Sequence, residues 1–278
     1  MNALEYAQNA QGSFTIPDIL FKVKELLEDE SSTMEDFANV ISVDPSLTSH
    51  LLKMANSAIY CFPGEISTIS RAITVIGTQA IYSLMLVDLA ATAFKHFSTT
   101  SIDTKRFWQM SVYCALATKN LALKAGVGDI ERLFVAGLLQ NFGELIVARQ
   151  SPKKAEKCEQ YYSKHMPWAV QNKIFDFVYA DVTAELLKLW QIPEKIILPI
   201  RHFNSANSIQ INKDVKVLYL ASRLSLCHCY PEHYELKDLI DHKMARDLNI
   251  TEEDLTDCID FADAETNNIL SIMHADMF

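Results

Sequence analysis

Apolar residues recur at helical spacing along most of the chain, and polar capping residues stand where the apolar segments begin. After Pro17, the apolar residues Ile19, Leu20, Val23 and Leu26 follow at helical intervals. This spacing places their side chains on one face of an amphipathic helix, and proline is well tolerated at a first helical position. The segment after Pro17 is therefore predicted to be a helix.

Short polar side chains mark the starts of further helices at Thr33, Asp44, Thr68 and Thr78. Each can accept a hydrogen bond from the free N–H groups of a first helical turn. Gly77 ends the helix that Thr68 begins, and an apolar helix then continues to about residue 94. Beyond a polar stretch at 95–104, we expect helices near residues 105–124, 130–149, 152–164, 168–190, 193–202, 213–229, 237–248 and 252–273. Neither alternating strands and crossovers nor a fixed repeat is visible, so the chain is predicted to be all-α.

Composition agrees with this interpretation. Of the 278 residues, 49% are hydrophobic and only 7 are Gly and 8 Pro, which allows one large helical domain or two modest ones. The apolar run from Ala80 to Phe94 is interrupted by Asp88 and is too short to span a bilayer comfortably, so we expect a buried core helix. No secretory signal is visible. We expect a cytoplasmic protein that engages no membrane, with reduced thiols at Cys61, Cys114, Cys158, Cys227, Cys229 and Cys258.

The net charge of −10 is concentrated near the C-terminus. Nine acidic residues and no Lys or Arg follow Arg246, so the remaining chain is close to neutral. Without a basic face, the chain is not expected to bind nucleic acid. Within the acidic segment, Leu255, Ile259 and Ala262 are spaced as the apolar face of an amphipathic helix. We interpret its acidic outer face as solvated; a docking surface for a basic partner is the alternative.

The segment from Phe134 to Leu145 reads Phe-Val-Ala-Gly-Leu-Leu-Gln-Asn-Phe-Gly-Glu-Leu. It resembles the central helix of the HD superfamily of metal-dependent phosphohydrolases, in the form carried by the bacterial HDOD signalling family. The resemblance extends over about residues 13–205, because further runs similar to the family's motifs occur in the right order: Phe14–Pro17, Asp44–Thr48, Leu51–Tyr60, Ile66–Ile69 and Leu186–Pro193.

This resemblance implies a domain organisation. We expect an HD-like helical bundle preceded by an N-terminal helical subdomain, which together form an HDOD domain at residues 13–205. The N-terminal subdomain is placed at 13–97 and the HD-like subdomain at 103–205. Residues 206–278 are expected to form a C-terminal helical extension with an acidic face.

The resemblance also places the metal ligands of the catalytic relatives on this sequence. In those relatives a His, a His-Asp pair and a later Asp converge on a metal ion that polarises phosphate and activates water. Here the first His position carries Met110, the pair is Gln140-Asn141, and a position that often carries His is Tyr179. Only His202 remains of a possible His pair. Thioether, amide and phenol groups are weak ligands for divalent ions, so we predict no metal, no cofactor and no catalytic residue.

Alternatives remain open for these five positions. The residues could line an uncharged pocket for a nucleotide or other small effector, since amides both donate and accept hydrogen bonds. We favour the simpler interpretation that they hydrogen-bond one another and fill the space. A residual metal-dependent phosphohydrolase would need a carboxylate from Glu144, Asp176 or Asp181. For those three residues, solvated helix-face charge or local pairing is the expected role.

Two other groups of residues invite a functional interpretation. Asn56 and Ser57 lie near a predicted helix end. Capping or a buried hydrogen bond is their expected role, and a ligand or partner contact is the alternative. Cys227-His228-Cys229 suggests a zinc site, but residues i and i+2 diverge on a helix and the spacing matches no common zinc module. We expect ordinary reduced cysteines there.

The leading hypothesis is a non-catalytic bacterial regulatory module for signal transduction that acts by protein–protein interaction. The resemblance implies a place among two-component and cyclic-nucleotide signalling systems. Its expected partners are therefore signalling proteins: a sensor kinase, a response regulator or a cyclic-nucleotide enzyme. A nucleotide or small-effector sensor is the main alternative. The sequence predicts no oligomeric state.

Overall fold

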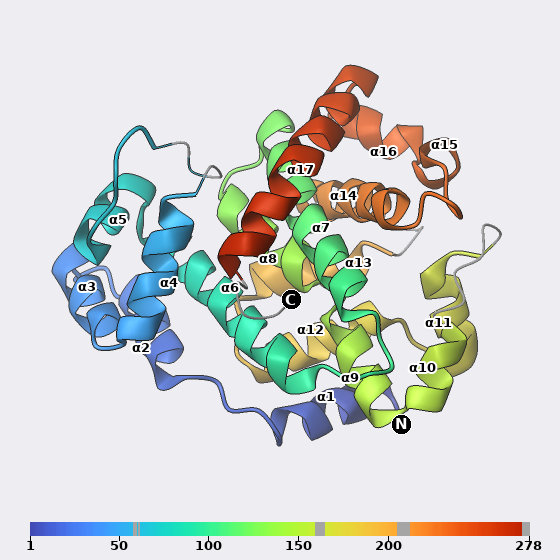
Figure 1. Cartoon of the computed structure of the whole chain (residues 1–278), viewed down its shortest axis with the longest axis horizontal. Helices are drawn as coiled ribbons and strands as arrows, with labels where there is room; N and C mark the ends of the chain where they lie inside the picture. Colours follow the sequence, from blue (N-terminus) through green and yellow to red (C-terminus); the bar gives the residue numbers. More distant parts are fainter. Residues whose placement is uncertain (58–59, 61, 159–164, 205–211, 274–278) are drawn as a thin grey trace. The chain divides into compact units, whose positions relative to one another are not determined.

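The computed structural model describes residues 1–57, 60, 62–158, 165–204 and 212–273. Every regular element in these ranges is an α-helix, so the predicted all-α fold is confirmed (Figure 1). The helices are α1 (Ala3–Gln11), α2 (Asp18–Glu28), α3 (Met34–Ser42), α4 (Pro45–Ala55), α5 (Ile69–Ile76), α6 (Thr78–Phe97), α7 (Thr104–Lys124), α8 (Ile130–Leu139), α9 (Phe142–Gln150), α10 (Pro152–Cys158), α11 (Pro167–Phe175), α12 (Tyr179–Leu189), α13 (Glu194–His202), α14 (Lys213–Cys229), α15 (Leu236–Leu239), α16 (His242–Asp247) and α17 (Glu252–Met273).

Contacts within the chain divide it into two compact units. The first unit contains residues 1–14 and 94–266, and the second contains residues 15–93 and 267–278. Most of the predicted C-terminal extension therefore lies in the same unit as residues 103–205.

In the second unit, the starts of α3 and α4 are capped at predicted residues, whereas Thr78, predicted as a cap, is the first helical residue of α6. Thr33 and Asp36 form a reciprocal capping box at α3, in which the Asp36 carboxylate accepts a hydrogen bond of 2.8 Å from the Thr33 N–H. At α4, the Asp44 carboxylate accepts bonds of 2.9 and 3.0 Å from the N–H groups of Ser46 and Leu47. These bonds satisfy N–H groups that a helix start otherwise leaves unpaired. Both predicted starts are confirmed.

Asn56 and Ser57 close the C-terminal end of α4. The Asn56 side-chain amide donates to the carbonyl oxygens of Leu52 and Ile66, both at 2.8 Å, and accepts from the Ile66 N–H at 2.8 Å. The Ser57 hydroxyl donates to the Met54 carbonyl oxygen at 2.6 Å. The expected capping role is confirmed, and Asn56 also ties the backbone at Ile66 to the helix end.

The apolar segment after Thr78 forms α6. Its residues Ile81, Leu86 and Ala90 are no more than 1% exposed, which confirms the predicted buried core helix. Among the described residues, no single helix is both long and apolar enough to cross a membrane. Helices α5 and α6 meet those criteria only as a pair, and that pair is bent by 116°.

In the first unit, α7 packs against both α8 and α14, while α12 packs against α1, α9 and α13 (Figure 1). On α7, the side chains of Trp108, Tyr113 and Leu116 are almost completely buried. Trp190, which follows α12, is only 1% exposed, as expected for an aromatic side chain that anchors a helix end in the core. Aromatic side chains of this size supply much of the buried apolar area in such a core.

Two glycines let the backbones of neighbouring helices approach closely. A Cβ atom at Gly137 of α8 would lie 2.6 Å from the Thr118 hydroxyl oxygen and 2.8 Å from the Ala115 Cα atom, both on α7. A Cβ atom at Gly143 of α9 would overlap the backbone carbonyl oxygen of Tyr179 at the start of α12. A side chain larger than hydrogen therefore does not fit at either position without moving a helix.

Two segments predicted as single helices are broken in the structure. The segment 130–149 breaks at Gln140-Asn141, between α8 and α9. The segment 168–190 breaks after α11, where Asp176 has a left-handed backbone with φ of 62°, a conformation that Asp tolerates better than most residues. Apolar residues continue at helical spacing through both breaks. Tertiary packing rather than local helix propensity therefore determines where the helices break.

Other differences lie nearer the ends of the chain. The sequence pattern does not predict α1. The segment 237–248, predicted as one helix, is divided because the backbone at Ile240 is extended and the Asp241 carboxylate caps α16 by accepting from the Lys243 N–H at 2.8 Å. Of the predicted helix 152–164, residues after Cys158 lie outside the described ranges.

Replacing Gly143 with alanine is expected to lower the free energy of unfolding by about 1–3 kcal/mol. The reason is that the new methyl group would meet backbone rather than a flexible side chain. Gly128→Ala is the matched control, because nothing lies within 4 Å of a Cβ atom there, and its unfolding free energy should stay within about 0.5 kcal/mol of the parent value. Urea unfolding measures both. Equal stability of the two variants would contradict the close approach of α9 to α12.

Candidate functional site

Four of the five residues at the HD ligand positions line one cavity in the first unit. Met110 comes from α7, Gln140 and Asn141 come from the break between α8 and α9, and Tyr179 is the first residue of α12. His202, the fifth residue, does not line the cavity, although the two residues after it do. The structure thus brings together residues that are far apart in the sequence.

The break between α8 and α9 places two polar side chains at the cavity. Gln140 follows α8 and is only 3% exposed. Asn141 precedes α9, but its side chain does not cap that helix. Instead, the Gly143 N–H donates a hydrogen bond of 2.8 Å to the Thr183 hydroxyl on α12. One N–H group of the first turn of α9 is therefore satisfied by α12, and the Asn141 side chain lines the cavity.

Helices α9, α11 and α14 and the end of α13 complete the wall. The further lining residues are Glu144, Pro167, Trp168, Gln171, Ala180, Phe203, Asn204, Ser222 and Leu226. The cavity volume is about 40 Å³, which leaves room for about three water molecules. An apolar cavity that binds benzene measures about 150 Å³. In this conformation the cavity therefore admits a small polar group rather than a nucleobase.

Amides on the cavity wall differ in their hydrogen bonding. The Gln171 side-chain oxygen accepts a bond of 2.9 Å from the Tyr179 N–H, so this amide holds the start of α12. In the described part of the chain, the side-chain amides of Gln140 and Asn141 make no hydrogen bond; only the Gln140 backbone carbonyl is contacted, by the Thr183 hydroxyl at 3.4 Å. The expectation that the residues at these positions hydrogen-bond one another and fill the space is therefore wrong for both amides.

Glu144 is the only carboxylate among the described residues that line the cavity. The Asp181 carboxylate accepts the Val178 N–H at 2.9 Å and so caps α12. Asp176 ends α11 and is exposed to solvent. The local roles expected for these two aspartates are confirmed, whereas Glu144 belongs to the cavity.

Within the described ranges, no group of three His, Cys, Asp or Glu side chains is placed to hold a metal ion. At Cys227-His228-Cys229, burial raises the pKa of Cys227 to about 11 and that of Cys229 to about 12. Both thiols are therefore protonated at neutral pH, and the thiol is a poor metal ligand compared with the thiolate. His228 has other contacts: its Nδ1 lies 3.0 Å from the Asp263 carboxylate, and its ring stacks on Tyr113.

Arg223 lies behind the cavity wall on α14 and is 3% exposed. Its Nη1 donates to the Ser222 hydroxyl at 2.8 Å, to the Phe203 carbonyl oxygen at 3.3 Å and to the Asn204 side-chain oxygen at 3.5 Å. These three acceptors belong to residues that line the cavity. A fourth acceptor, the Tyr219 carbonyl oxygen at 3.4 Å, lies on α14 outside the lining. Burial lowers the pKa of Arg223 to about 10, so the guanidinium remains charged at neutral pH.

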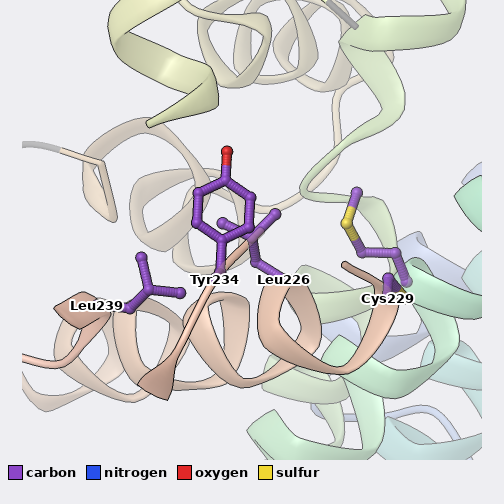
Figure 2. Packing of buried hydrophobic residues seen from close by; sticks show 5 residues of the cluster. Leu226, Cys229, Tyr234 and Leu239 are labelled. Carbon is purple, nitrogen blue, oxygen red and sulfur yellow. The ribbon is translucent and has the colours of Figure 1, made fainter. Parts of the chain in front are cut away.

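An apolar cluster continues from the cavity along α14. Met110 and Leu226 line the cavity and also pack with the buried residues Cys229, Tyr234 and Leu239. Figure 2 shows Tyr234 between Leu226 and Leu239, with its hydroxyl pointing away from α14. One end of the cavity is therefore continuous with a hydrophobic core, which fixes the position of Met110.

Sequence reasoning missed Trp168, Gln171, Ser222 and Arg223. The first two lie between the motifs that carry the family resemblance, and the last two lie on α14 beyond it. The only available signal is Arg223 itself, a single charged residue within the run Leu218–Leu226. An arginine on an otherwise apolar helix face indicates a buried cation, which is rare and needs a specific environment.

An HD-like helical frame that carries neutral side chains at the ligand positions is a degenerate relative of the HD phosphohydrolases. A family model of the HDOD domain matches residues 14–206, and the chain belongs to this family. An uncharacterised protein of Treponema pallidum (strain Nichols) is 25% identical over 195 residues, covering 68% of this chain and 37% of that protein. The chain thus spans well under half the length of that relative.

Solved structures share the fold. An HDOD domain protein of unknown function from Geobacter sulfurreducens matches with a TM-score of 0.71 at 20% identity, covering 99% of both chains. A structure named provisionally as a signal transduction protein, from Marinobacter aquaeolei VT8, gives 0.70 at 20% identity over 94% of this chain and 59% of that one. One named provisionally as a phosphohydrolase, from Shewanella amazonensis SB2B, gives 0.67 at 20% identity over 98% and 94%. At these identities the likeness concerns the fold alone.

The two glutamines on the cavity wall are expected to respond differently to replacement by methionine, which has a similar shape. Gln140→Met removes an amide that has no hydrogen bond to a described residue and should change the free energy of unfolding by less than about 1 kcal/mol. Gln171→Met leaves the buried Tyr179 N–H without its acceptor, and this should cost about 1–3 kcal/mol. Urea unfolding compares them. A larger loss for Gln140→Met than for Gln171→Met would contradict the hydrogen bonding described.

Proposed function

We propose that this HDOD chain is a non-catalytic regulatory module of bacterial signal transduction that acts by binding other proteins in the cytoplasm. One observation carries the proposal: the cavity at the HD positions is lined by Met110, Gln140, Asn141 and Tyr179. These side chains are weak ligands for the divalent ions that phosphate hydrolysis requires. The expected partners are a sensor kinase, a response regulator or a cyclic-nucleotide enzyme. The provisional name of the Marinobacter structure agrees with a signalling role.

A groove in the first unit supports protein binding. Leu236 and Ile240 line it from the α15 segment, and Leu255 and Ile259 line it from α17, around a volume of about 250 Å³. Exposed acidic side chains occur on the same segments: Glu235, Asp238, Asp241, Glu252, Glu253 and Asp260. Lys237, His242, Glu252 and Thr256 complete the lining. A largely apolar groove with more acidic than basic side chains around it fits an amphipathic helix that has a basic face. We assign the partner to this groove.

Nearby basic residues leave part of this acidic charge available. Lys124 is engaged by Asp254 at 2.8 Å and by Asp257 at 2.9 Å. Lys237 pairs with Glu235 at 2.6 Å. Asp260, which adjoins the groove residue Ile259, forms no ion pair with a described residue and is exposed. Its charge is therefore free to attract a basic partner and to increase the rate of association.

A second candidate function is the sensing of a small effector in the cavity. The observation that favours it is the pair of side-chain amides, Gln140 and Asn141, that have no hydrogen bond in the described structure. Amide groups that face a cavity without a protein partner can donate hydrogen bonds to a ligand or accept them from it. The cavity volume of about 40 Å³ limits such an effector to a small molecule or to one end of a larger one.

The proposal predicts partner binding without hydrolysis. Purified chain should release no product from cyclic dinucleotides or phosphodiester model substrates in the presence of Mn²⁺ or Mg²⁺. Affinity capture from the native cell should recover a signalling protein, identified by mass spectrometry. Asp260→Lys should reduce that capture at least about fivefold by reversing a charge beside the groove.

Glu25→Lys makes the same charge change at an exposed site on α2, and capture by this variant should be unchanged. Equal capture by both variants would contradict the groove as the binding surface. Metal-dependent turnover that is lost in Glu144→Gln would contradict the non-catalytic role and favour a hydrolase instead.

A further inference from the structure

Arg223 is a buried cation that forms no ion pair with any described carboxylate. Its side chain is 3% exposed, and none of the described carboxylates lies within ion-pair distance of it. Its Nε atom is buried and has no hydrogen-bond partner in the described structure. Removing a charged group from water costs several kcal/mol unless an opposite charge or a full set of hydrogen bonds compensates. Arg223 has only part of this compensation.

Aromatic rings hold the guanidinium in place. Its Cζ atom lies 3.8 Å from the centroid of the Tyr219 ring and 4.2 Å from that of the Trp168 ring. Arginine stacks well on aromatic faces, and such contacts are stronger when water is excluded. Trp168 belongs to the cavity wall and Tyr219 to α14. The charge is therefore fixed beside the cavity.

One hydrogen bond of Arg223 engages a side-chain amide on the cavity wall. The Asn204 side-chain oxygen accepts from the Arg223 Nη1 at 3.5 Å. The NH₂ group of that amide donates to no described residue, and Asn204 lines the cavity. Gln140 and Asn141 add side-chain amides without hydrogen bonds in the described structure. Amide N–H donors beside a fixed positive charge are suited to bind an anion.

We propose that this cavity binds a small oxyanion, either a carboxylate or a phosphate group, whose charge compensates Arg223. Asn204, Gln140 and Asn141 would donate hydrogen bonds to the oxyanion, and Arg223 would supply the positive potential from behind the wall. The volume of about 40 Å³ restricts the ligand to a small anion or to the anionic end of a larger molecule. The inference rests on the second candidate function, effector sensing, and is independent of partner binding at the groove.

Glu144 opposes such a ligand, because its carboxylate lines the same cavity. The direction in which oxyanion affinity changes when this charge is removed therefore tests the proposal. Glu144→Gln keeps the shape of the side chain and removes its negative charge, so it should strengthen oxyanion binding. A general effect of ionic strength on exposed charges should be the same in the parent chain and in Glu144→Gln, because salt screens all exposed charges.

The experiment is a calorimetric titration of the full chain with sodium acetate and, separately, with sodium phosphate, each against sodium chloride at equal ionic strength. Thermal unfolding under the same conditions supports it, because a ligand that binds only the folded state raises Tm. Saturable binding of at least one oxyanion is expected. The arm that responds, acetate or phosphate, identifies the chemistry. Failure of both arms would overturn the inference.

Asn204→Asp is the decisive variant, since it places a carboxylate beside Arg223 with almost no change in shape. It should raise Tm without ligand and weaken oxyanion binding at least about tenfold, because the internal anion replaces the external one. Arg223→Met should weaken binding to a similar extent. Undiminished binding in Asn204→Asp would overturn the inference even if Arg223→Met does not fold. Phosphate also stabilises proteins by being excluded from their surface. A rise in Tm that does not saturate and is equal in the parent and in Asn204→Asp would reflect that exclusion and would count against the inference.

Discussion

The close approach of α8 and α9 to their neighbours is the constraint on which the site depends. Gly137 lies against the backbone of α7, and Gly143 lies against the start of α12. Neither position has room for a Cβ atom. The break between α8 and α9 lies between these two contacts. Gln140 and Asn141 occupy that break, which brings them to one cavity with Met110. The same packing would assemble metal ligands in a catalytic relative, but here the ligand positions at the cavity carry neutral side chains.

The consequence of that replacement is electrostatic. A metal site collects negative charge around a cation, whereas this cavity has one carboxylate, Glu144, and a buried guanidinium, Arg223, behind its wall. The fold therefore retains a polar cavity with less negative charge than a metal site collects. A site with this distribution is suited to recognise an anionic group without the ion that would activate water. The protein partner that we propose would bind a different part of the first unit, the groove between α15 and α17.

Much of the fold follows from the sequence, because helix starts are decided locally. Thr33 and Asp44 accept hydrogen bonds from the first turns that follow them, and such short-range chemistry can be read directly. The breaks at Gln140 and Asp176 could not be read, since the apolar spacing continues through them and packing decides the outcome. The family resemblance located Met110, Gln140, Asn141 and Tyr179 at the cavity, but gave no reason to expect Arg223. Which residues of α11 and α14 approach the cavity depends on contacts between distant segments, and spacing along the chain does not encode them.

We propose that an HD-like frame has kept its geometry and lost its metal chemistry. Equilibrium dialysis of the purified full chain against Mn²⁺, followed by elemental analysis, tests it most directly, because metal affinity requires suitable ligands whatever the substrate. We expect no stoichiometric metal in the parent chain and the same result in Glu144→Gln. One bound ion per chain that disappears in Glu144→Gln would contradict it.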